Sequence, residues 1–258
     1  MRPKVNLNLI LNCCIFCIAT IVLTQNVWCD DKKLTDKAEL SFVQASGNTD
    51  ISTFNGKNTL KYDFSKNFST QWKASALYGE TDNEKTAEKY ATELRGDHNF
   101  YKNFYYYLVT GWTQDEFAGI DDRYYAGPGA GYKVTFKDRH TLAMELGANY
   151  AREVYIEDPE SETPYEEDSE FLEGRGFGSY IYKFNDKVEF SEEVEYLKNF
   201  KEESAYTVRS TSAIKSRLNS WLELKVSYEV NYNNRPKPES ENLKYTDTLL
   251  SVALVVNI

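Results

Sequence analysis

The feature of this chain that most limits its fold is a long alternation of apolar and polar residues. From 222 to 232 the even-numbered residues are Leu, Leu, Val, Tyr, Val and Tyr, and the residues between them are Glu, Lys, Ser, Glu and Asn. A repeat of two residues puts each set on one face of a β-strand, so one face meets an apolar medium and the other meets water. Similar alternation in 142–150 and 250–258 predicts an all-β fold.

We expect about twelve such strands, each longer than the roughly five or six residues of a typical globular strand and suited to crossing a bilayer at a tilt. In one of them Glu192 falls on the apolar side, so either a bulge lies there or the predicted register is wrong. The expected segments are 36–47, 50–64, 68–80, 87–99, 104–115, 122–136, 140–153, 169–184, 187–199, 204–218, 221–232 and 244–258.

The predicted connections alternate in kind. Five are tight and contain Asn or Asp, which tolerate the left-handed conformation that tight hairpins need. On the other side they are mostly longer and polar, with 47–49 as the short exception. Aromatic residues stand beside the tight turns, as at a membrane interface. Together these features predict an antiparallel, up-and-down transmembrane β-barrel with both termini in the periplasm. The tight connections are 65–67, 100–103, 137–139, 185–186 and 219–220, and the longer ones are 81–86, 116–121, 154–168 and 233–243.

The first 29 residues have the pattern of an export signal. Arg2 and Lys4 precede an apolar stretch at 7–23, and Val27-Trp28-Cys29 resembles a cleavage site. A retained helical anchor and a lipoprotein with lipid on Cys29 are the alternatives. Cleavage removes all four cysteines, so the single barrel domain at 30–258 would hold no disulfide. We expect export to the outer membrane of a Gram-negative-type bacterium.

The charge of the chain argues against several functional classes. Lys and Arg number 30 against 40 acidic residues, which leaves no basic surface for nucleic acid. Without Arg2 and Lys4, 28 basic residues remain and the formal charge is −12. Two histidines and no mature cysteine argue against most zinc and thiol chemistry. We therefore expect no cofactor, no metal and no catalytic residue.

Three segments carry a resemblance to a known family. Ser46-Gly47-Asn48-Thr49 resembles its first hairpin, 123–132 resembles its central Gly-Pro-Gly strand, and Thr246-Asp247-Thr248 before an alternating strand resembles its ending. The family is the YdiY-like salt-induced outer-membrane proteins, whose function is unknown. The resemblance covers about residues 36–258 and implies an outer-membrane β-barrel linked to salt or osmotic stress, with no catalytic residues to transfer.

The Gly-Pro-Gly segment also has a physical interpretation. Gly127, Gly129 and Gly131 share the parity of Arg123 and Lys133 and should face the lumen. Their missing side chains leave room for a bulky neighbour or for a passage. Pro128 cannot donate to the ladder and implies a bulge or a break. A kink without any role in transport is the alternative interpretation.

Twelve strands enclose a lumen between the filled barrel of about eight strands and the open porin of about sixteen. We therefore predict a narrow interior lined by charges that pair across it. The candidates for the lumen wall are Glu93, Arg95, Lys133, Glu145, Arg175, Glu193, Glu195, Arg209, Lys215, Glu223, Lys225 and Glu229.

An acidic run lies in and beside the longest predicted external loop. It is expected to be a solvated loop, or to gather small cations at the mouth and bridge through them to lipopolysaccharide. If the barrel conducts, this run predicts cation preference at low salt. Further expected partners are outer-membrane lipid and, during biogenesis, the barrel-assembly machinery. The run consists of Glu157, Asp158, Glu160, Glu162, Glu166, Glu167, Asp168 and Glu170.

The residues offer little for catalysis. His98 and His140 lie beside tight turns and lack the His-x-Ser neighbourhood of outer-membrane phospholipases. Adjacent carboxylates such as Glu192 and Glu193 point to opposite faces of a strand. We predict a narrow pore or a structural barrel that is not an enzyme. The alternatives are a membrane-embedded hydrolase of lipid or glycan, and a secreted, soluble β-sandwich that binds sugar.

Overall fold

The computed structural model describes residues 33–45, 51–156, 168–202, 204–234 and 245–258. These ranges form twelve strands and one 3₁₀ helix, η1 (Glu116–Ala118). Within them, no helix is long and apolar enough to cross a membrane. The predicted export signal at 1–29 lies outside the described residues. The strands are β1 (Leu34–Ala45), β2 (Ile51–Asp63), β3 (Phe68–Thr81), β4 (Glu84–Tyr101), β5 (Phe104–Asp115), β6 (Ile120–Phe136), β7 (His140–Tyr155), β8 (Asp168–Lys183), β9 (Val188–Asn199), β10 (Tyr206–Arg217), β11 (Leu222–Asn233) and β12 (Thr246–Asn257).

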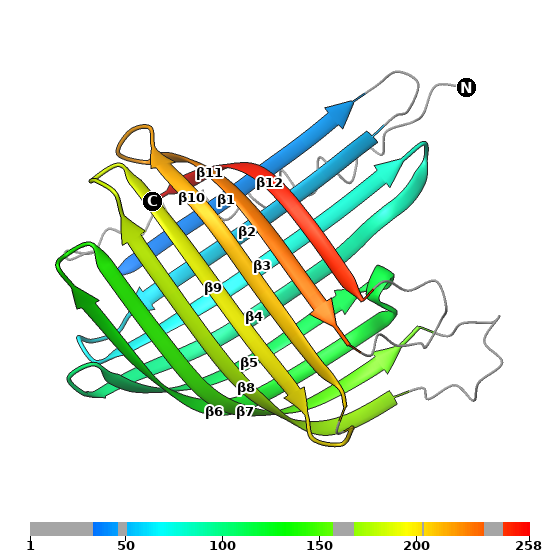
Figure 1. The fold of residues 1–258 in the computed structure, drawn as a ribbon, viewed down its shortest axis with the longest axis horizontal. Coiled ribbons are helices and arrows are strands. Elements are labelled where there is room, and N and C mark those ends of the chain that lie inside the picture. The colour runs from blue at the N-terminus through cyan, green and yellow to red at the C-terminus, as the bar shows by residue number, and fades with distance from the viewer. Residues whose placement is uncertain (1–32, 46–50, 157–167, 203, 235–244) are drawn as a thin grey trace.

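The strands form one closed antiparallel barrel. Each pairs with its neighbours in sequence, and β1 pairs with β12 to close the sheet (Figure 1). Every strand begins and ends within three residues of its predicted segment. The predicted fold class, an antiparallel up-and-down transmembrane barrel of twelve strands, is confirmed. The side of the membrane on which the termini lie stays a prediction.

The outer face of the sheet is apolar and the inner face is polar, as a barrel in a bilayer requires. On β7, Met144, Leu146 and Tyr150 are more than half exposed, whereas Glu145 and Asn149 are buried. Buried polar and exposed apolar side chains reverse the usual order of a water-soluble protein. They are typical of a barrel with an apolar outer belt and a polar interior.

The tight turns use side-chain hydrogen bonds more than the sequence suggested. The Asn219 side-chain oxygen accepts hydrogen bonds from the backbone N–H groups of Trp221 and Leu222, at 2.9 and 2.8 Å. Asn185 does the same for Lys187 and Val188. Neither asparagine has a positive φ, so here asparagine closes the turn with its side chain and not by a left-handed backbone.

Two expectations need correction. The connection after β3 is predicted to be long, but β4 begins at Glu84, and Asp82 and Asn83 alone make a tight turn with positive φ. Glu192 sits in an unbroken register with both neighbouring strands, so no bulge lies there. Its carboxylate shares the outer face with Val194 and accepts hydrogen bonds from the Ser210 and Ser212 hydroxyls, which satisfy its charge on that face.

Candidate functional site: a charge network in the lumen

The glycines of β6 make room for two tyrosines of β5. Tyr105 lies opposite Gly131 and Tyr107 lies opposite Gly129 in the β5–β6 register. A Cβ atom added to Gly129 would lie 2.2 Å from Cζ of Tyr107, and one added to Gly131 would lie 2.4 Å from Cζ of Tyr105. Both rings therefore lie across β6 on the inside of the barrel. The prediction that these glycines leave room for a bulky neighbour is confirmed.

Pro128 breaks the ladder between β6 and β7. Registered pairs stop at Ala126–Tyr150 and resume at Gly129–Gly147 with no change of register. Of the two predicted possibilities, a bulge or a break, the structure has a break. Proline lacks the N–H that this ladder would use.

The tyrosine hydroxyls reach charged groups on more distant strands. Tyr105 Oη donates to Oε1 of Glu145 on β7 at 2.6 Å, and Tyr107 Oη accepts from Nη1 of Arg175 on β8 at 2.8 Å. Because β6 carries glycine at these positions, each ring spans a whole strand. The local sequence of β6 thus decides which residues of β5, β7 and β8 can touch.

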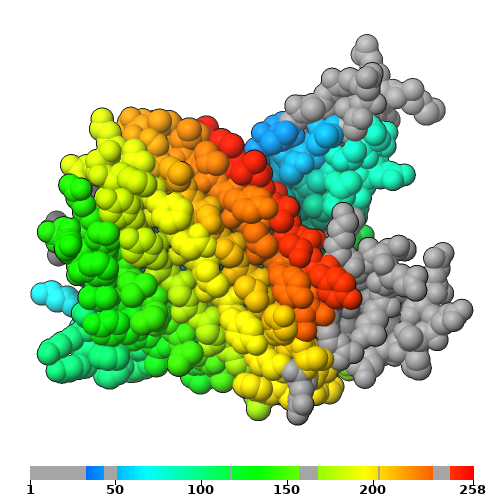
Figure 2. Space-filling model, in the orientation of Figure 1, coloured from blue at the N-terminus to red at the C-terminus, as the bar shows by residue number. Residues whose placement is uncertain are grey.

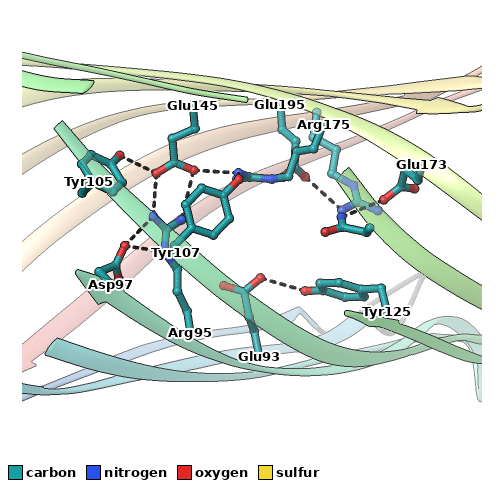
Figure 3. A network of polar contacts seen from close by, with 12 residues as sticks. Glu93, Arg95, Asp97, Tyr105, Tyr107, Tyr125, Glu145, Glu173, Arg175 and Glu195 are labelled. Atoms are coloured by element: carbon teal, nitrogen blue, oxygen red, sulfur yellow. Dashed lines mark hydrogen bonds and ion pairs between the residues drawn. The ribbon is translucent and has the colours of Figure 1, made fainter. Parts of the chain in front are cut away.

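Glu145 is the centre of the network in Figure 3. Its carboxylate accepts hydrogen bonds from Arg95 at 2.7 and 3.0 Å and from Arg175 at 2.6 Å. Arg95 also binds Asp97 at 2.7 Å, and its guanidinium lies 4.0 Å from the centre of the Tyr107 ring. Charge-assisted bonds and a cation–π contact together hold these side chains in one arrangement.

The network continues around the wall through Glu195. Arg175 Nε donates to Glu195 at 2.6 Å, and Arg209 on β10 reaches the same carboxylate at 3.2 Å. Two arginines thus share Glu195 as two share Glu145. Cationic and anionic side chains therefore follow one another around the wall from β4 to β10, and each of these arginines is paired with a carboxylate.

A second cluster lies nearer the long connections. Arg123 is buried and bonds Glu173 at 2.6 Å and also Glu153. Asn149 donates to the other oxygen of Glu173 at 3.1 Å. Buried charges are costly unless they are paired and hydrogen-bonded, and each of these is.

A third contact repeats the tyrosine-over-glycine arrangement. Tyr125 on β6 lies over Gly111 on β5, where an added Cβ would meet Cζ at 2.4 Å. Its hydroxyl donates to Glu93 on β4 at 2.7 Å. Lys73 pairs with the same Glu93 at 3.3 Å.

A cavity of about 100 Å³ lies between the second cluster and the ends of the strands. Lys89 of β4 and Asn231 of β11 line the same cavity, so it extends across the interior of the barrel. Arg123, Glu173 and Arg209 also line it. A polar vestibule therefore lies beside the paired charges.

The remaining predicted lumen residues lie apart from this network. Lys215 pairs with Glu189 at 2.5 Å, and Glu223 lies 3.7 Å from Arg217. Lys225 pairs with Glu39 at 2.7 Å, and Glu229 binds Lys57. Lys133 and Glu193 share the parity of the inner face and are exposed.

Most of the predicted acidic loop, 157–167, lies outside the described residues. Asp168 and Glu170 open β8, where Arg152 pairs with them at 2.8 and 3.9 Å. The acidic run therefore has a cationic partner at its end.

Sequence reasoning missed the tyrosines. We assigned aromatic residues to the lipid interface and considered only charged residues for the lumen. The missed signal is parity, because Tyr105 and Tyr107 alternate with Phe104, Tyr106 and Leu108, which are exposed. It also missed Asp97, Asn149 and Glu153 as network members, whereas parity had already placed Arg123 on the lumen face.

The histidines lie outside this network. His98 stacks on Tyr106 at 5.0 Å, and His140 Nδ1 lies 2.8 Å from Tyr180 Oη. In the described part of the chain, neither ring is hydrogen-bonded to a serine or a carboxylate, and no group of three His, Cys, Asp or Glu residues is placed to hold a metal ion.

Comparisons with known proteins give relatives along most of the chain. This chain is 26% identical over 218 residues to the uncharacterized protein YdiY of Escherichia coli (strain K12). The aligned region covers 83% of this chain and 79% of that protein. Among solved structures, the NanC porin matches with a TM-score of 0.48 and 9% identity over 86% of this chain and 97% of that one. An outer-membrane channel from Pseudomonas putida F1 matches with a TM-score of 0.49 and 9% identity over 87% and 94%.

The family model described as "Protein of unknown function, DUF481" matches residues 38–258. That span includes β2 to β12 entire and residues 38–45 of β1. The resemblance inferred from the three motifs is thereby confirmed, and the chain belongs to the DUF481 family of proteins of unknown function, with YdiY as a relative.

Proposed function

We propose that this protein is a narrow pore of the bacterial outer membrane, with its constriction at Arg95, Glu145 and Arg175. The observation that carries the proposal is the burial of charged side chains on the inner face of the barrel. Glu145 is 6% exposed and Tyr107 is 1% exposed. Arg95 and Arg175 cover these side chains from the lumen side, so the interior is narrower at this level than the backbone barrel.

The chemistry of this level suits small hydrated ions more than large solutes. Each arginine there has at least two acceptor groups, so the charges are compensated locally. A passing ion exchanges part of its hydration for carboxylate and guanidinium contacts, as in filters built from charged rings. The polar vestibule described above offers a site where ions of either sign can bind before they enter the constriction.

The direct test is single-channel recording with the purified protein in planar bilayers. We expect small, well-defined current steps. Arg95→Ala and Arg175→Ala together should enlarge them, because two long side chains leave the constriction. Lys85→Ala, at an exposed position near the start of β4, is the matched control and should leave the steps unchanged. Silence of the wild-type protein at every salt concentration would refute the pore and leave a structural barrel.

The location has its own test. After membrane fractionation, a gel run with and without boiling should show the protein in the outer-membrane fraction with two mobilities, because closed barrels resist unfolding until heated. Equal mobility would contradict a folded barrel. A role in salt or osmotic stress is part of the proposal, and a deletion strain should then grow more slowly at high salt.

A further inference from the structure

The seam between β1 and β12 differs from all other contacts between neighbouring strands. β1 and β12 share four registered pairs, from Lys37–Asn257 to Leu40–Leu254, and backbone hydrogen bonds add Asp36–Ile258. The other neighbours share eleven to fifteen pairs each. Figure 1 shows that β1 (blue) and β12 (red) diverge beyond this short paired segment. In Figure 2 the blue and red atoms touch only beside that segment.

The open part of the seam lies in the apolar belt. Beyond Leu40 and Leu254, residues 41–45 of β1 and 249–253 of β12 have no registered partner across the seam among the described residues. The outward side chains beside the gap, Phe42 and Val252, are 53% and 55% exposed. Unpaired backbone groups in hydrocarbon cost several kcal/mol each. A split at this depth is tolerated where polar molecules reach it from the lumen.

Two ion pairs cross the seam on its inner side. Lys225 of β11 reaches over β12 to Glu39 of β1 at 2.7 Å, and Lys57 of β2 binds Glu229 of β11. The intervening inward residues of β12 include Ser251 and Ala253, whose small side chains let the lysine pass. Glu39 and Lys57 are direct partners in the β1–β2 register. The four charges therefore form a latch next to the point where the ladder ends.

The inner wall at the seam combines an apolar row with charged groups. The inward residues of β12 include Leu249, Ala253 and Val255, and the four latch charges lie on the strands beside them. Across the interior, β4, β7 and β8 carry the arginine and glutamate network. A molecule with one polar and one apolar end matches both surfaces at once.

We propose that the β1–β12 seam is a lateral portal through which a single-chain amphiphile passes between the lumen and the membrane, and that the Glu39–Lys225 and Lys57–Glu229 pairs latch it. The polar head stays against the charged wall while the chain leaves between Phe42 and Val252. Passage breaks no covalent bond. This goes beyond an axial ion pore, because the route ends in the bilayer and not in water.

A photoreactive lysophosphatidylcholine with a diazirine on its acyl chain tests the portal. The protein is reconstituted in phosphatidylcholine vesicles, and labelled residues are mapped by mass spectrometry. We expect labels on outward Leu250 and also on inward Ser41 and Ala253. As a reference, inward Ser179 of β8, which is paired on both sides, should stay unlabelled.

A disulfide lock supplies the decisive comparison. Val43 and Ser251 would face each other if the ladder continued in register, so Val43→Cys/Ser251→Cys closes the seam when oxidised. The lock should reduce inward labelling roughly tenfold, because a disulfide holds the two Cα atoms within about 6 Å. Reduction should restore it. Lys37→Cys/Asn257→Cys, in the zipped part of the same strands, is the control and should change nothing.

Several results would overturn the portal. These are unlabelled inward residues in the wild type, equal labelling with and without the lock, no intramolecular disulfide at 43 and 251, and a disulfide-linked dimer, which would mean that a second copy pairs with the open edges. Outward labelling of Leu250 shows that each variant is folded in the bilayer. Ion conductance measured on the same samples is a separate readout, so failure of the axial pore leaves this test intact.

The latch has a charge-swap test. Lys225→Gln should raise inward labelling severalfold because the seam loses one crossing ion pair. Glu39→Lys combined with Lys225→Glu should return it toward the wild-type level. Equal labelling in all three proteins would refute the latch and leave the portal without it.

Discussion

Gly129→Ala is the substitution for which the structure predicts the largest effect from the smallest change. One added methyl would lie 2.2 Å from Cζ and 2.3 Å from Oη of Tyr107. The ring cannot move outward, since β6 lies behind it, so it must lift into the lumen. Tyr107 then loses its hydrogen bond with Arg175, and Arg95 loses the ring face against which it packs.

The magnitude follows from these two losses. Overpacking of a filled site costs about 1–3 kcal/mol. A hydrogen bond to a charged group contributes about 1.5–3 kcal/mol. Because part of the ring's contact survives the shift, we expect the free energy of unfolding to fall by about 2–4 kcal/mol.

The assay is urea unfolding of the protein in lipid vesicles, followed by tryptophan fluorescence. Gly178→Ala is the matched control, because an added Cβ at Gly178 meets nothing within 4 Å. Tyr107→Ala should remove the clash, so Gly129→Ala should cost almost nothing in that background. Equal stability of the two alanine variants, or additive costs in the double variant, would refute the reasoning.

Three further predictions concern conduction and fold. Glu145→Gln removes the negative charge that Arg95 and Arg175 share, so the reversal potential in a salt gradient should shift toward anion preference. The outward substitution Glu192→Gln is the control and should not shift it. Equal shifts in the two variants would contradict the constriction. Cation preference at low salt should weaken as the Debye length falls from about 30 Å at 0.01 M to about 3 Å at 1 M. It should disappear at low salt when the acidic loop residues are replaced by their amides, and anion preference of the wild type would contradict this role. The substitutions are at Glu162, Glu166, Glu167 and Asp168.

The strands could be predicted closely because their signal is local. Alternation with a period of two depends on which face a residue occupies, and only a few outward positions break it, among them Asp36, Asn58 and Glu192. Each of these has a physical reason that alternation cannot show: Asn58 donates to Asp36, and two serine hydroxyls of the next strand donate to Glu192. The network at Glu145 could be predicted only as a set of inward charges. Its partners are 50 and 30 residues away, and their meeting depends on the four registers that join β4 to β8.

The seam shows the same limit more sharply. Alternation continues without change past Leu40 and Leu254, where pairing stops, since Phe42 and Val252 still face outward. A period of two shows which face each side chain occupies, but it does not show whether a neighbouring strand is paired at that position. Pairing at the closure depends on the tilt accumulated around the barrel, which no single strand encodes. One local clue exists, because β11 places Lys225 inward opposite the small Ala253 of β12, and its side chain can therefore reach Glu39 on the far side of that strand.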